Sequence, residues 1–374
     1  MGGATDRNQR LGLAHAGLST GQAGASGRTG GESRMIADPV LVTGGAGFLG
    51  RRLVRRLLAA GARVRVLDKA ADAADSALAG AELVPASVTD REAVRKALAG
   101  TRTIFHMAAL THLWLPDPQA YRRVNYEGTL IVLEEAWRAG IERFVHTVSE
   151  VVLRGWDDPD PSPIDENTPA APVTRMAGPY SCSKWWADQA VRNAIAAGLP
   201  AVILYPAIPV GGDDRSRTPP TRMLEQFLFA PPPAYLDCAL NLLDAEDIVT
   251  AHLLAAEQAP AGSRYVIGAP ATPMSRLLAI VAEVTGRPPP RRRVPFPIAL
   301  ATARLAELRA RRTGIPPLAS VEGVRLARYP RPLDSTRART ELGWVPRPVE
   351  EALRTAVAAI WQNGIPRSRH PRAA

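Results

Sequence analysis

A tyrosine and a lysine four residues apart could carry proton-transfer chemistry. Tyr180 and Lys184 stand at the start of a predicted helix over 181–197, and this spacing places both side chains on one helical face. A phenol with an ordinary pKa of about 10 needs a neighbouring cation to act as a base near neutral pH. The chain has three lysines against 43 arginines, and a compact ammonium suits this role. The pair predicts an active site, with an ordinary surface pair as the competing interpretation.

A glycine-rich turn could hold a dinucleotide. Gly44, Gly47 and Gly50 follow a GxxGxxG spacing between an apolar run and an amphipathic stretch. Such glycines permit a tight turn, let the backbone approach a pyrophosphate, and allow close packing of helix on strand. Phe48 and Leu49 lie in the same turn, where the helix N-terminus offers free N–H groups. We expect all five residues to bind the cofactor.

Asp68 indicates which dinucleotide binds. It ends a second predicted strand eighteen residues beyond Gly50, where a carboxylate can accept hydrogen bonds from the adenosine ribose hydroxyls. A carboxylate there repels a 2′-phosphate, so NAD is favoured over NADP. Lys69 and the pair Arg51 and Arg52 could meet a phosphate, and they leave NADP open.

Alternating strands and helices must position these residues. Short apolar runs predict strands, and amphipathic stretches between them predict helices; the strands are 39–43, 63–67, 81–85, 103–107, 143–149 and 201–205, and the helices 48–60, 90–99, 118–138 and 181–197. Alternation at this spacing is typical of an α/β fold with a doubly wound parallel sheet, the Rossmann arrangement. The ligand crevice of such a sheet lies at the carboxyl ends of its strands.

The chain divides into four expected regions. Residues 1–34 lack an apolar stripe and predict a disordered leader, with Met35 as an alternative start to Met1. Residues 35–206 form the expected dinucleotide-binding domain. Residues 207–363, richer in Pro and Gly loops, predict a smaller α-rich substrate lobe with some segments returning to the sheet. Residues 364–374 form a basic tail.

The net charge of +10 is concentrated near the C-terminus. Residues 287–374 hold eighteen arginines and six acidic residues, so the rest of the chain is net negative. Ordinary surface arginines in an arginine-rich chain are the first interpretation of this excess. The functional alternatives are an anionic substrate group or weak attraction to an acidic membrane surface, and nucleic acid is disfavoured because no stacking aromatics are interleaved with the arginines. No apolar run is long enough to span a membrane. Two cysteines fit a reducing compartment, and we expect the cytoplasm.

The chain resembles the extended short-chain dehydrogenase/reductases, in their NAD-dependent epimerase/dehydratase branch. The stretches that carry the resemblance are 42–50, 104–109, 124–129, 143–149, the Tyr180/Lys184 pair and 204–207. More narrowly, 112–118, 234–243 and 341–348 are similar to the hopanoid-associated sugar epimerase group, also labelled dihydroflavonol-4-reductase-like.

The resemblance implies roles for individual residues. Ser149 would hydrogen-bond the substrate oxygen, Tyr180 would act as the base and Lys184 as its partner. The residues that would line the cofactor are Val88, Ala108, Ala109, Asn125, Pro206 and Ile208. Thr111, His112 and Trp114, with Ser149, would face the substrate. No cluster has the spacing of a metal site, so we expect no metal.

Several positions depart from the family pattern. Ser87 stands where an aspartate usually contacts adenine, Tyr205 replaces an arginine, and Val148 replaces a second serine. Glu150 is followed by Val151, so the dehydratase interpretation loses its second acid. His106 and His146 lie in apolar strands, and we expect them to be structural.

These observations favour an NAD(P)-dependent sugar epimerase acting on a nucleotide- or lipid-linked sugar, with Tyr180 taking a hydroxyl proton during transient hydride transfer. An NAD(P)H-dependent ketone reductase or alcohol dehydrogenase of the dihydroflavonol or 3β-hydroxysteroid type is the alternative, because it uses the same residues. A non-catalytic NAD-binding regulator comes third. The resemblance also implies a homodimer.

Overall fold

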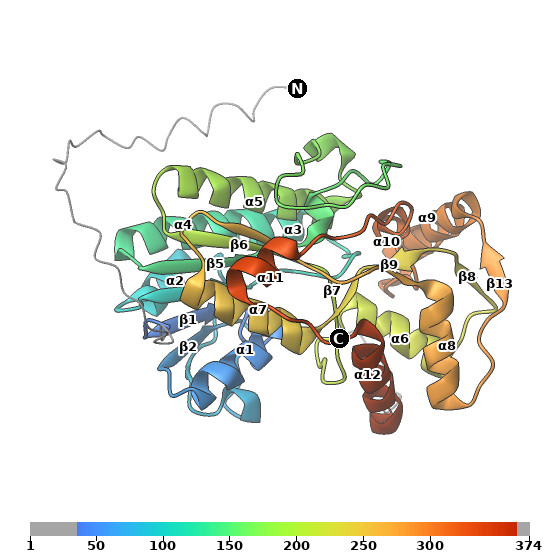
Figure 1. The fold of residues 1–374 in the computed structure, drawn as a ribbon, viewed down its shortest axis with the longest axis horizontal. Helices are drawn as coiled ribbons and strands as arrows, with labels where there is room; N and C mark the ends of the chain where they lie inside the picture. The colour runs from blue at the N-terminus through green and yellow to red at the C-terminus, as the bar shows by residue number, and fades with distance from the viewer. Residues whose placement is uncertain (1–35, 365–374) are drawn as a thin grey trace. The chain divides into compact units, whose positions relative to one another are not determined.

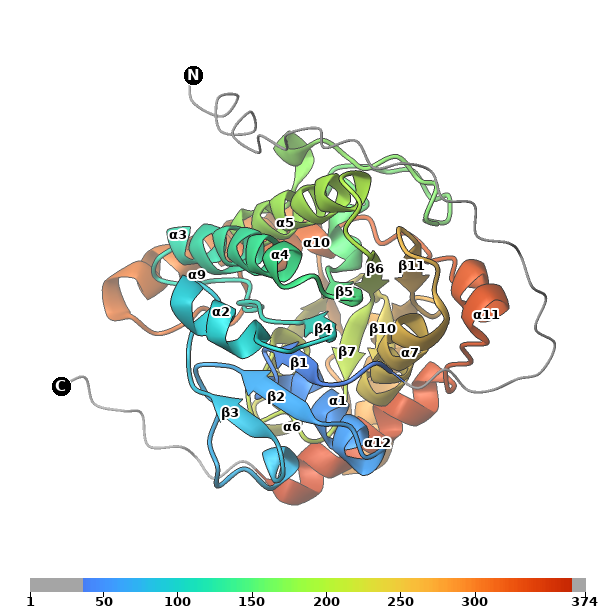
Figure 2. The same cartoon turned by 90° about the vertical axis from the view of Figure 1, so that its left-hand side faces the viewer.

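A seven-stranded parallel sheet forms the centre of the protein (Figures 1 and 2). We describe it from a computed structural model, which covers residues 36–364; the expectations for 1–34, Met35 and 365–374 lie outside these residues. The strand order is β11-β6-β5-β4-β1-β2-β3. The strands are β1 (Val40–Thr43), β2 (Val64–Leu67), β3 (Glu82–Val84), β4 (Thr103–His106), β5 (Arg143–Thr147), β6 (Ala201–Pro206) and β11 (Arg264–Ile267). The doubly wound parallel sheet is therefore confirmed.

The central strands are apolar because helices cover both faces of the sheet. Every residue of β1, β4 and β6 is buried, as a parallel strand between two helical layers requires. The strand order changes direction between β1 and β4, which pair directly. A crevice opens at such a switch point, at the carboxyl ends of the strands.

Two layers of helices enclose the sheet, as Figure 2 shows. One layer holds α2 (Arg91–Leu98), α4 (Gly128–Ala139) and α5 (Pro179–Ala196), and the other holds α1 (Phe48–Ala59), α7 (Ala245–Gln258) and α11 (Thr336–Leu342). The expected helical segment over 118–138 is confirmed as one unbroken helical run, made of α3 (Gln119–Tyr121), a π-helical turn over Arg122–Glu127 and α4.

The seventh strand comes from the C-terminal part of the chain. β11 pairs with β6 in parallel register, from Arg264 opposite Ile203 to Ile267 opposite Pro206. The helices α7 and α11 also pack on the sheet, so segments beyond residue 206 complete the dinucleotide-binding layer. All described residues fall within one compact unit, and the division into 35–206 and 207–363 stays a proposal about function.

The remaining C-terminal segments form a second region beside the carboxyl ends of the strands (Figure 1). Its helices are α6 (Pro219–Phe229), α8 (Met274–Thr285), α9 (Phe296–Thr313), α10 (Val321–Leu326) and α12 (Val349–Asn363). Three strand pairs connect them: β7 (Ile208–Val210) with β10 (Leu242–Asp244), β9 (Ala239–Leu240) with β12 (Thr272–Pro273), and β8 (Ala234–Leu236) with β13 (Arg292–Val294). No helix among the described residues is long and apolar enough to cross a membrane.

Candidate active site

A cavity of about 2300 Å³ lies between the carboxyl ends of the strands and the C-terminal region. Segments from Gly44 to Pro330 contribute to its walls. The expected site residues that line it are Gly44, Gly47, Phe48, Leu49, Gly50, Asp68, Val88, Ala108, Ala109, Thr111, His112, Trp114, Ser149, Tyr180, Lys184, Pro206 and Ile208. The structure thus brings together almost all the candidate residues that the sequence suggested.

The glycine turn is built for close backbone contacts. Gly44 has a φ of +72°, and a Cβ there would lie 2.7 Å from the backbone nitrogen of Ala108. At Gly50 a Cβ would lie 2.1 Å from the carbonyl oxygen of Gly44. Gly47 is less crowded, since its Cβ would come no closer than 3.1 Å. No side chain among the described residues caps the first turn of α1, so its N–H groups are free for an anion.

Asp68 lies at the end of β2, on the wall of the cavity. Its carboxylate accepts hydrogen bonds from the backbone nitrogens of Ala46 (3.1 Å) and Ala70 (2.8 Å). These bonds fix the carboxylate beside the glycine turn, where a ribose would bind. Together with the uncapped α1 N-terminus, this arrangement fits NAD.

The arginines that follow the glycine turn are bound to acidic partners. Arg51 pairs with Asp75 at 2.7 Å, and Arg52 lies 3.3 Å from Glu246. Both side chains are buried. Neither is therefore free to bind a 2′-phosphate, and of the basic residues considered for that role only Lys69 faces the cavity.

Asn125 lies behind the cavity wall and does not line it. Its amide nitrogen donates to the Leu110 carbonyl at 3.0 Å and to the Ser183 hydroxyl at 3.0 Å, while its oxygen accepts from the Leu110 backbone nitrogen at 2.7 Å. The residue sits in the π-helical turn, which aims its side chain at the loop after β4. Asn125 therefore holds this loop in place, and the expected contact with the cofactor stays a prediction.

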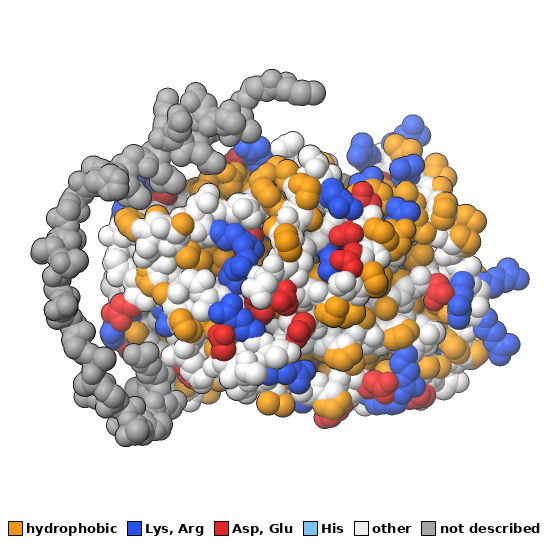
Figure 3. All heavy atoms as spheres, turned by 45° about the horizontal axis from the view of Figure 1, so that its top comes forward, with side chains coloured by type: hydrophobic (Ala, Val, Ile, Leu, Met, Phe, Trp, Pro, Cys, Tyr) orange, Lys and Arg blue, Asp and Glu red, His pale blue; other side chains and the backbone are white. Residues whose placement is uncertain are grey.

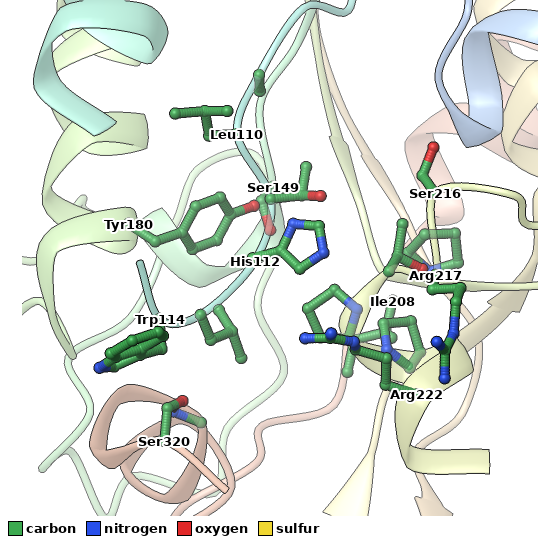
Figure 4. Close-up of a pocket in the computed structure, with 18 of the residues that line it drawn as sticks. Leu110, His112, Trp114, Ser149, Tyr180, Ile208, Ser216, Arg217, Arg222 and Ser320 are labelled. Atoms are coloured by element: carbon green, nitrogen blue, oxygen red, sulfur yellow. Dashed lines mark hydrogen bonds between the residues drawn. The ribbon is translucent and has the colours of Figure 1, made fainter. Parts of the chain in front are cut away.

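Tyr180, Lys184 and Ser149 face the cavity together. Tyr180 lies in the first turn of α5, and Ser149 follows β5; Figure 4 shows the tyrosine hydroxyl beside the serine. Lys184 is buried one turn further along α5 and donates to the Thr147 carbonyl at 2.9 Å. The helix and the strand end thus place a phenol, a hydroxyl and an ammonium around one space.

Burial perturbs both titrating groups of this trio. It raises the pKa of Tyr180, and the hydrogen bond from Ser149 partly offsets this effect. The negative charges of Glu322 and Glu150 raise the pKa of Tyr180 further. Burial lowers the pKa of Lys184 to about 8, although the charge of Asp188 acts in the opposite direction. Strongly shifted groups in a cavity are typical of an active site.

Glu322 is a residue that the sequence did not reveal. It belongs to α10, yet its carboxylate accepts from the backbone nitrogens of Tyr180 (3.1 Å) and Ser181 (2.7 Å) and from the Ser181 hydroxyl (2.6 Å). It therefore caps the N-terminus of α5 from a position more than 140 residues away. No local pattern links the two segments, so only the folded chain shows the contact.

The part of the cavity beyond Tyr180 is lined mainly by apolar side chains. They come from the loop after β4 and from the C-terminal region: Leu110, Leu113, Trp114, Ile208, Met223, Phe227, Leu236, Met274, Ile315, Leu318 and Val324. Two pairs of charged residues there neutralise each other, Arg217 with Glu225 at 2.9 Å and Arg154 with Glu150 at 3.3 Å.

Polar side chains also line that wall, among them His112, Ser216, Arg217, Arg222 and Ser320 (Figure 4). Burial lowers the pKa of His112, and the charge of Arg222 lowers it further. No ion pair or side-chain hydrogen bond ties Arg222 to another residue in the described part of the chain. The Tyr121 hydroxyl donates to the His112 carbonyl and fixes the loop that carries the histidine.

Comparison with known proteins identifies the family. The family model described as "NAD dependent epimerase/dehydratase family" matches residues 40–268, more than half of the chain. The chain belongs to the NAD-dependent epimerase/dehydratase family. Members related to it are NAD(P)-dependent epimerases, dehydratases and reductases, so the chain is an enzyme of this type.

Two curated relatives and one solved structure illustrate the range of this family. The chain is 30% identical over 328 residues to "Sterol demethylase protein B" of Methylococcus capsulatus, covering 87% of this chain and 99% of that one. It is 33% identical over 316 residues to a farnesyl-dihydroquinoline-oxide ketoreductase of Stigmatella aurantiaca, covering 82% and 91%. It shares the fold of Thermus thermophilus UDP-glucose 4-epimerase in complex with NAD, with a TM-score of 0.69, 24% identity and coverage of 87% and 99%.

The structure shows the contacts of three residues at or beside the positions where the chain departs from the epimerase/dehydratase pattern. The Tyr205 hydroxyl donates to Asp188 at 2.7 Å and accepts from Arg192 at 2.7 Å, in a buried network behind β6. Glu150 is buried against Arg154, so it is held as half of an ion pair. The Ser87 hydroxyl lies 2.8 Å from that of Thr89 and leaves no carboxylate at the adenine position.

The buried histidines lie in the sheet, outside the cavity. His106 contacts Thr43 at 2.7 Å and Thr129 at 2.9 Å, and burial lowers its pKa to about 3. His146 stacks on His106 with ring centroids 5.3 Å apart, and burial lowers its pKa as well. Both are neutral packing residues. The described residues contain no group of histidine, cysteine and acidic side chains placed to hold a metal ion.

Proposed function

We propose that this epimerase/dehydratase-family enzyme interconverts an alcohol and a ketone on a bulky, largely apolar substrate. One observation carries the proposal. The hydroxyls of Tyr180 and Ser149 open onto a space whose lining is mainly apolar, and Arg217 and Arg154 in its walls are paired with Glu225 and Glu150. A lining of this kind suits a substrate whose own surface is largely apolar.

The residues of the chain divide the work of the reaction. Ser149 donates a hydrogen bond to the substrate oxygen and holds it beside Tyr180. Tyr180 takes the hydroxyl proton when the substrate is an alcohol and returns it when the substrate is a ketone. Lys184 places a positive charge on the same face of α5 as the phenol, and a neighbouring cation favours the phenolate form. When bound, NAD(P) supplies the two-electron redox chemistry.

The names of two relatives support this substrate class. One acts in sterol demethylation according to its name, and the other is a ketoreductase of a compound that carries a farnesyl chain. Both match this chain over more than four fifths of its length. An apolar cavity wall suits molecules of this kind.

The test is an oxidoreductase assay on apolar alcohols and ketones. Purified protein would be mixed with NAD(H) or NADP(H) and a panel of sterols, prenylated ketones and dihydroflavonols, and the absorbance of the reduced nicotinamide followed. We expect net turnover with at least one substrate, and a rate about a thousandfold lower with Tyr180→Phe. Full conversion of a nucleotide sugar without net redox change would contradict the proposal.

Sugar epimerisation is the second candidate. It is favoured by the NAD-bound epimerase fold and by Arg222, a cation that faces the cavity, forms no ion pair with the residues of 36–364 and could hold a phosphate. The catalytic residues would be the same, since an epimerase returns the hydrogen to the opposite face of a transient ketone. Tightly bound NAD in the purified protein, with turnover on a nucleotide-sugar panel, would support it. A non-catalytic regulator would instead keep NAD binding and show no turnover.

The location and assembly of the enzyme are also proposals. Both cysteines, Cys182 and Cys238, are free thiols, which fits the cytoplasm. A homodimer through the outer surfaces of α4 and α5 is our proposal for assembly, and Trp137 on α4 is 43% exposed there.

A further inference from the structure

The helix α9 exposes a stripe of apolar side chains along its outer face. Ile298, Ala301, Leu305 and Leu308 follow a spacing of three, four and three residues, which places them on one side of a helix. Leu305 is 66% exposed and Leu308 is 56% exposed. Leucines exposed to this degree in a row are unusual for a water-facing helix.

The opposite face of α9 is firmly packed, so the stripe is a fixed feature. Ala299 and Ala303 are buried against Val324 of α10, with Phe296 and Leu300 beside them. Glu307 accepts a hydrogen bond from the Val321 backbone nitrogen at 2.7 Å and ties the two helices together. The helix therefore cannot turn its outer stripe inward.

Arginines surround this stripe. Helical geometry places Arg304 and Arg311 along one edge, Arg309 along the other, and Arg312 in line with the leucines. In the described part of the chain, none of these four side chains forms an ion pair. Residues 291–313 contain seven arginines and a single acid. Basic and hydrophobic side chains lie next to each other at the right-hand end of Figure 3, the end that α9 and β13 occupy in Figure 1.

The same stretch leads directly into the cavity. Residues 313–320 follow α9 and line the cavity wall. Ile315 and Leu318 in this segment are 55% and 69% exposed, although they also belong to that wall. Apolar side chains therefore occur both on the exterior of α9 and in the segment that lines the substrate space, with Arg309, Arg311 and Arg312 between them along the chain.

We propose that α9 and the segment 313–320 dock on the surface of an anionic lipid bilayer. The leucines and isoleucines enter the boundary between headgroups and acyl chains, while the arginine stems reach sideways to lipid phosphates. The mouth of the cavity then lies at the bilayer, where an apolar substrate is concentrated. This inference goes beyond the proposed function and does not depend on which apolar alcohol or ketone is converted.

The positive charge around the exposed face of α9 favours a lipid bilayer over a second copy of the chain as its binding partner. A self-associating face would bring two clusters of unpaired arginines together, and like charges at an interface oppose binding. An anionic lipid surface instead offers a negative charge opposite each arginine. Binding through such contacts should weaken as salt screens the charges.

The test is vesicle co-sedimentation of the full chain. The probes are vesicles of phosphatidylcholine alone and of phosphatidylcholine mixed with phosphatidylglycerol, each at low and high salt. We expect binding to the anionic vesicles that high salt reduces. Arg304→Gln with Arg311→Gln should weaken binding by about twenty-fivefold, since each arginine near an anionic surface contributes about fivefold. Leu305→Ser with Leu308→Ser should weaken it at least tenfold.

Matched variants show whether the effect belongs to this face. Arg63→Gln with Arg102→Gln removes the same charge at the amino ends of β2 and β4, away from the cavity, and Val345→Ser removes another exposed apolar side chain, which is 78% exposed. These controls should bind as the unmodified chain does. The proposal fails if anionic vesicles do not bind at low salt, or if the controls lose as much affinity as the α9 variants. It also fails if the leucine variant converts a dimer to a monomer in analytical ultracentrifugation. Unchanged NAD affinity and thermal unfolding would show that each variant is folded.

Discussion

The two halves of the cavity are built in different ways. The dinucleotide half is made of backbone, glycines and the first turns of α1 and α5, all held by a sheet with buried strands. The substrate half is made of side chains from loops and short elements that lie far apart in the sequence. A site formed by backbone atoms tolerates few substitutions, because its shape depends on the fold. A site formed by side chains can acquire a different substrate specificity when those side chains are substituted. Substitutions in the dinucleotide half should therefore cause large losses of stability or cofactor affinity. Substitutions in the substrate half should cause smaller changes in substrate affinity.

Tyr180→Phe should have the largest effect, because Tyr180 lies where the two halves meet. The change removes one hydroxyl and keeps the ring, so NAD affinity and unfolding temperature should stay the same. We expect kcat to fall by about a thousandfold, as for the loss of a general acid–base group. Steady-state kinetics on the substrate found in the oxidoreductase assay, with Tyr126→Phe as control, would measure it. Retained activity would remove Tyr180 from the mechanism.

Gly50→Ala should lower both the stability of the protein and its affinity for NAD, because it disturbs the packing of the dinucleotide half. The new Cβ would lie 2.1 Å from the Gly44 carbonyl oxygen, a backbone atom that cannot move aside as a flexible side chain can. We expect a loss of about 3 kcal/mol in the free energy of unfolding, because the helix must move away from the turn. NAD affinity should fall with it in calorimetric titration.

Gly47→Ala is the matched control for this prediction. Its Cβ would come no closer than 3.1 Å to the protein, so the fold should tolerate it. Its effect should appear in NAD affinity and hardly in stability, because the methyl group occupies the approach of the pyrophosphate. If Gly50→Ala and Gly47→Ala were equally stable, tight packing at Gly50 would not matter.

The same contrast explains what the sequence could predict. The glycine turn, the Tyr180/Lys184 pair and the first six strands are local patterns, and each could be recognised within a few consecutive residues. Strand β11 comes after the Pro- and Gly-rich segments, and only its pairing with β6 places it in the sheet.

Long-range contacts explain the rest. The carboxylate of Glu322 meets the backbone of Tyr180 across 142 positions of sequence. Asn125 has a polar side chain in a segment that resembles a cofactor-binding one, but a π-helical turn directs it to the Leu110 backbone. The apolar wall also depends on how loops fold over the sheet, for which the sequence offers no periodic pattern.

Trp114→Ala, in the substrate half of the cavity, should cause a moderate loss of substrate affinity. The indole lines the cavity and faces the space beyond Tyr180 (Figure 4). We expect KM for an apolar substrate to rise by about tenfold, because a large aromatic contact is lost, while NAD affinity stays the same. Trp137→Ala, on the outside of α4, is the control and should leave KM unchanged. If NAD affinity changed while KM stayed the same, Trp114 would belong to the dinucleotide half of the cavity.

Glu322→Gln should have the smallest effect on activity. It tests whether a residue of the C-terminal region influences Tyr180, which lies between the two halves of the cavity. The charge of Glu322 raises the pKa of Tyr180, so a neutral amide should lower that pKa. In the direction of alcohol oxidation, where Tyr180 acts as a base, the rise of kcat/KM with pH should move to lower pH. The amide oxygen can still accept from Ser181, so we expect kcat to fall by less than about tenfold.

Glu322→Ala separates the charge of this residue from its capping role. It removes the charge and every acceptor for the α5 N-terminus, so it should shift the pH profile in the same direction and lower kcat further than Glu322→Gln does. A residue that only packed would lower stability in both variants and leave the pH profile in place. Because Glu322 belongs to α10, a shifted profile would show that a helix of the C-terminal region adjusts the proton affinity of Tyr180, the group that lies where the two halves meet.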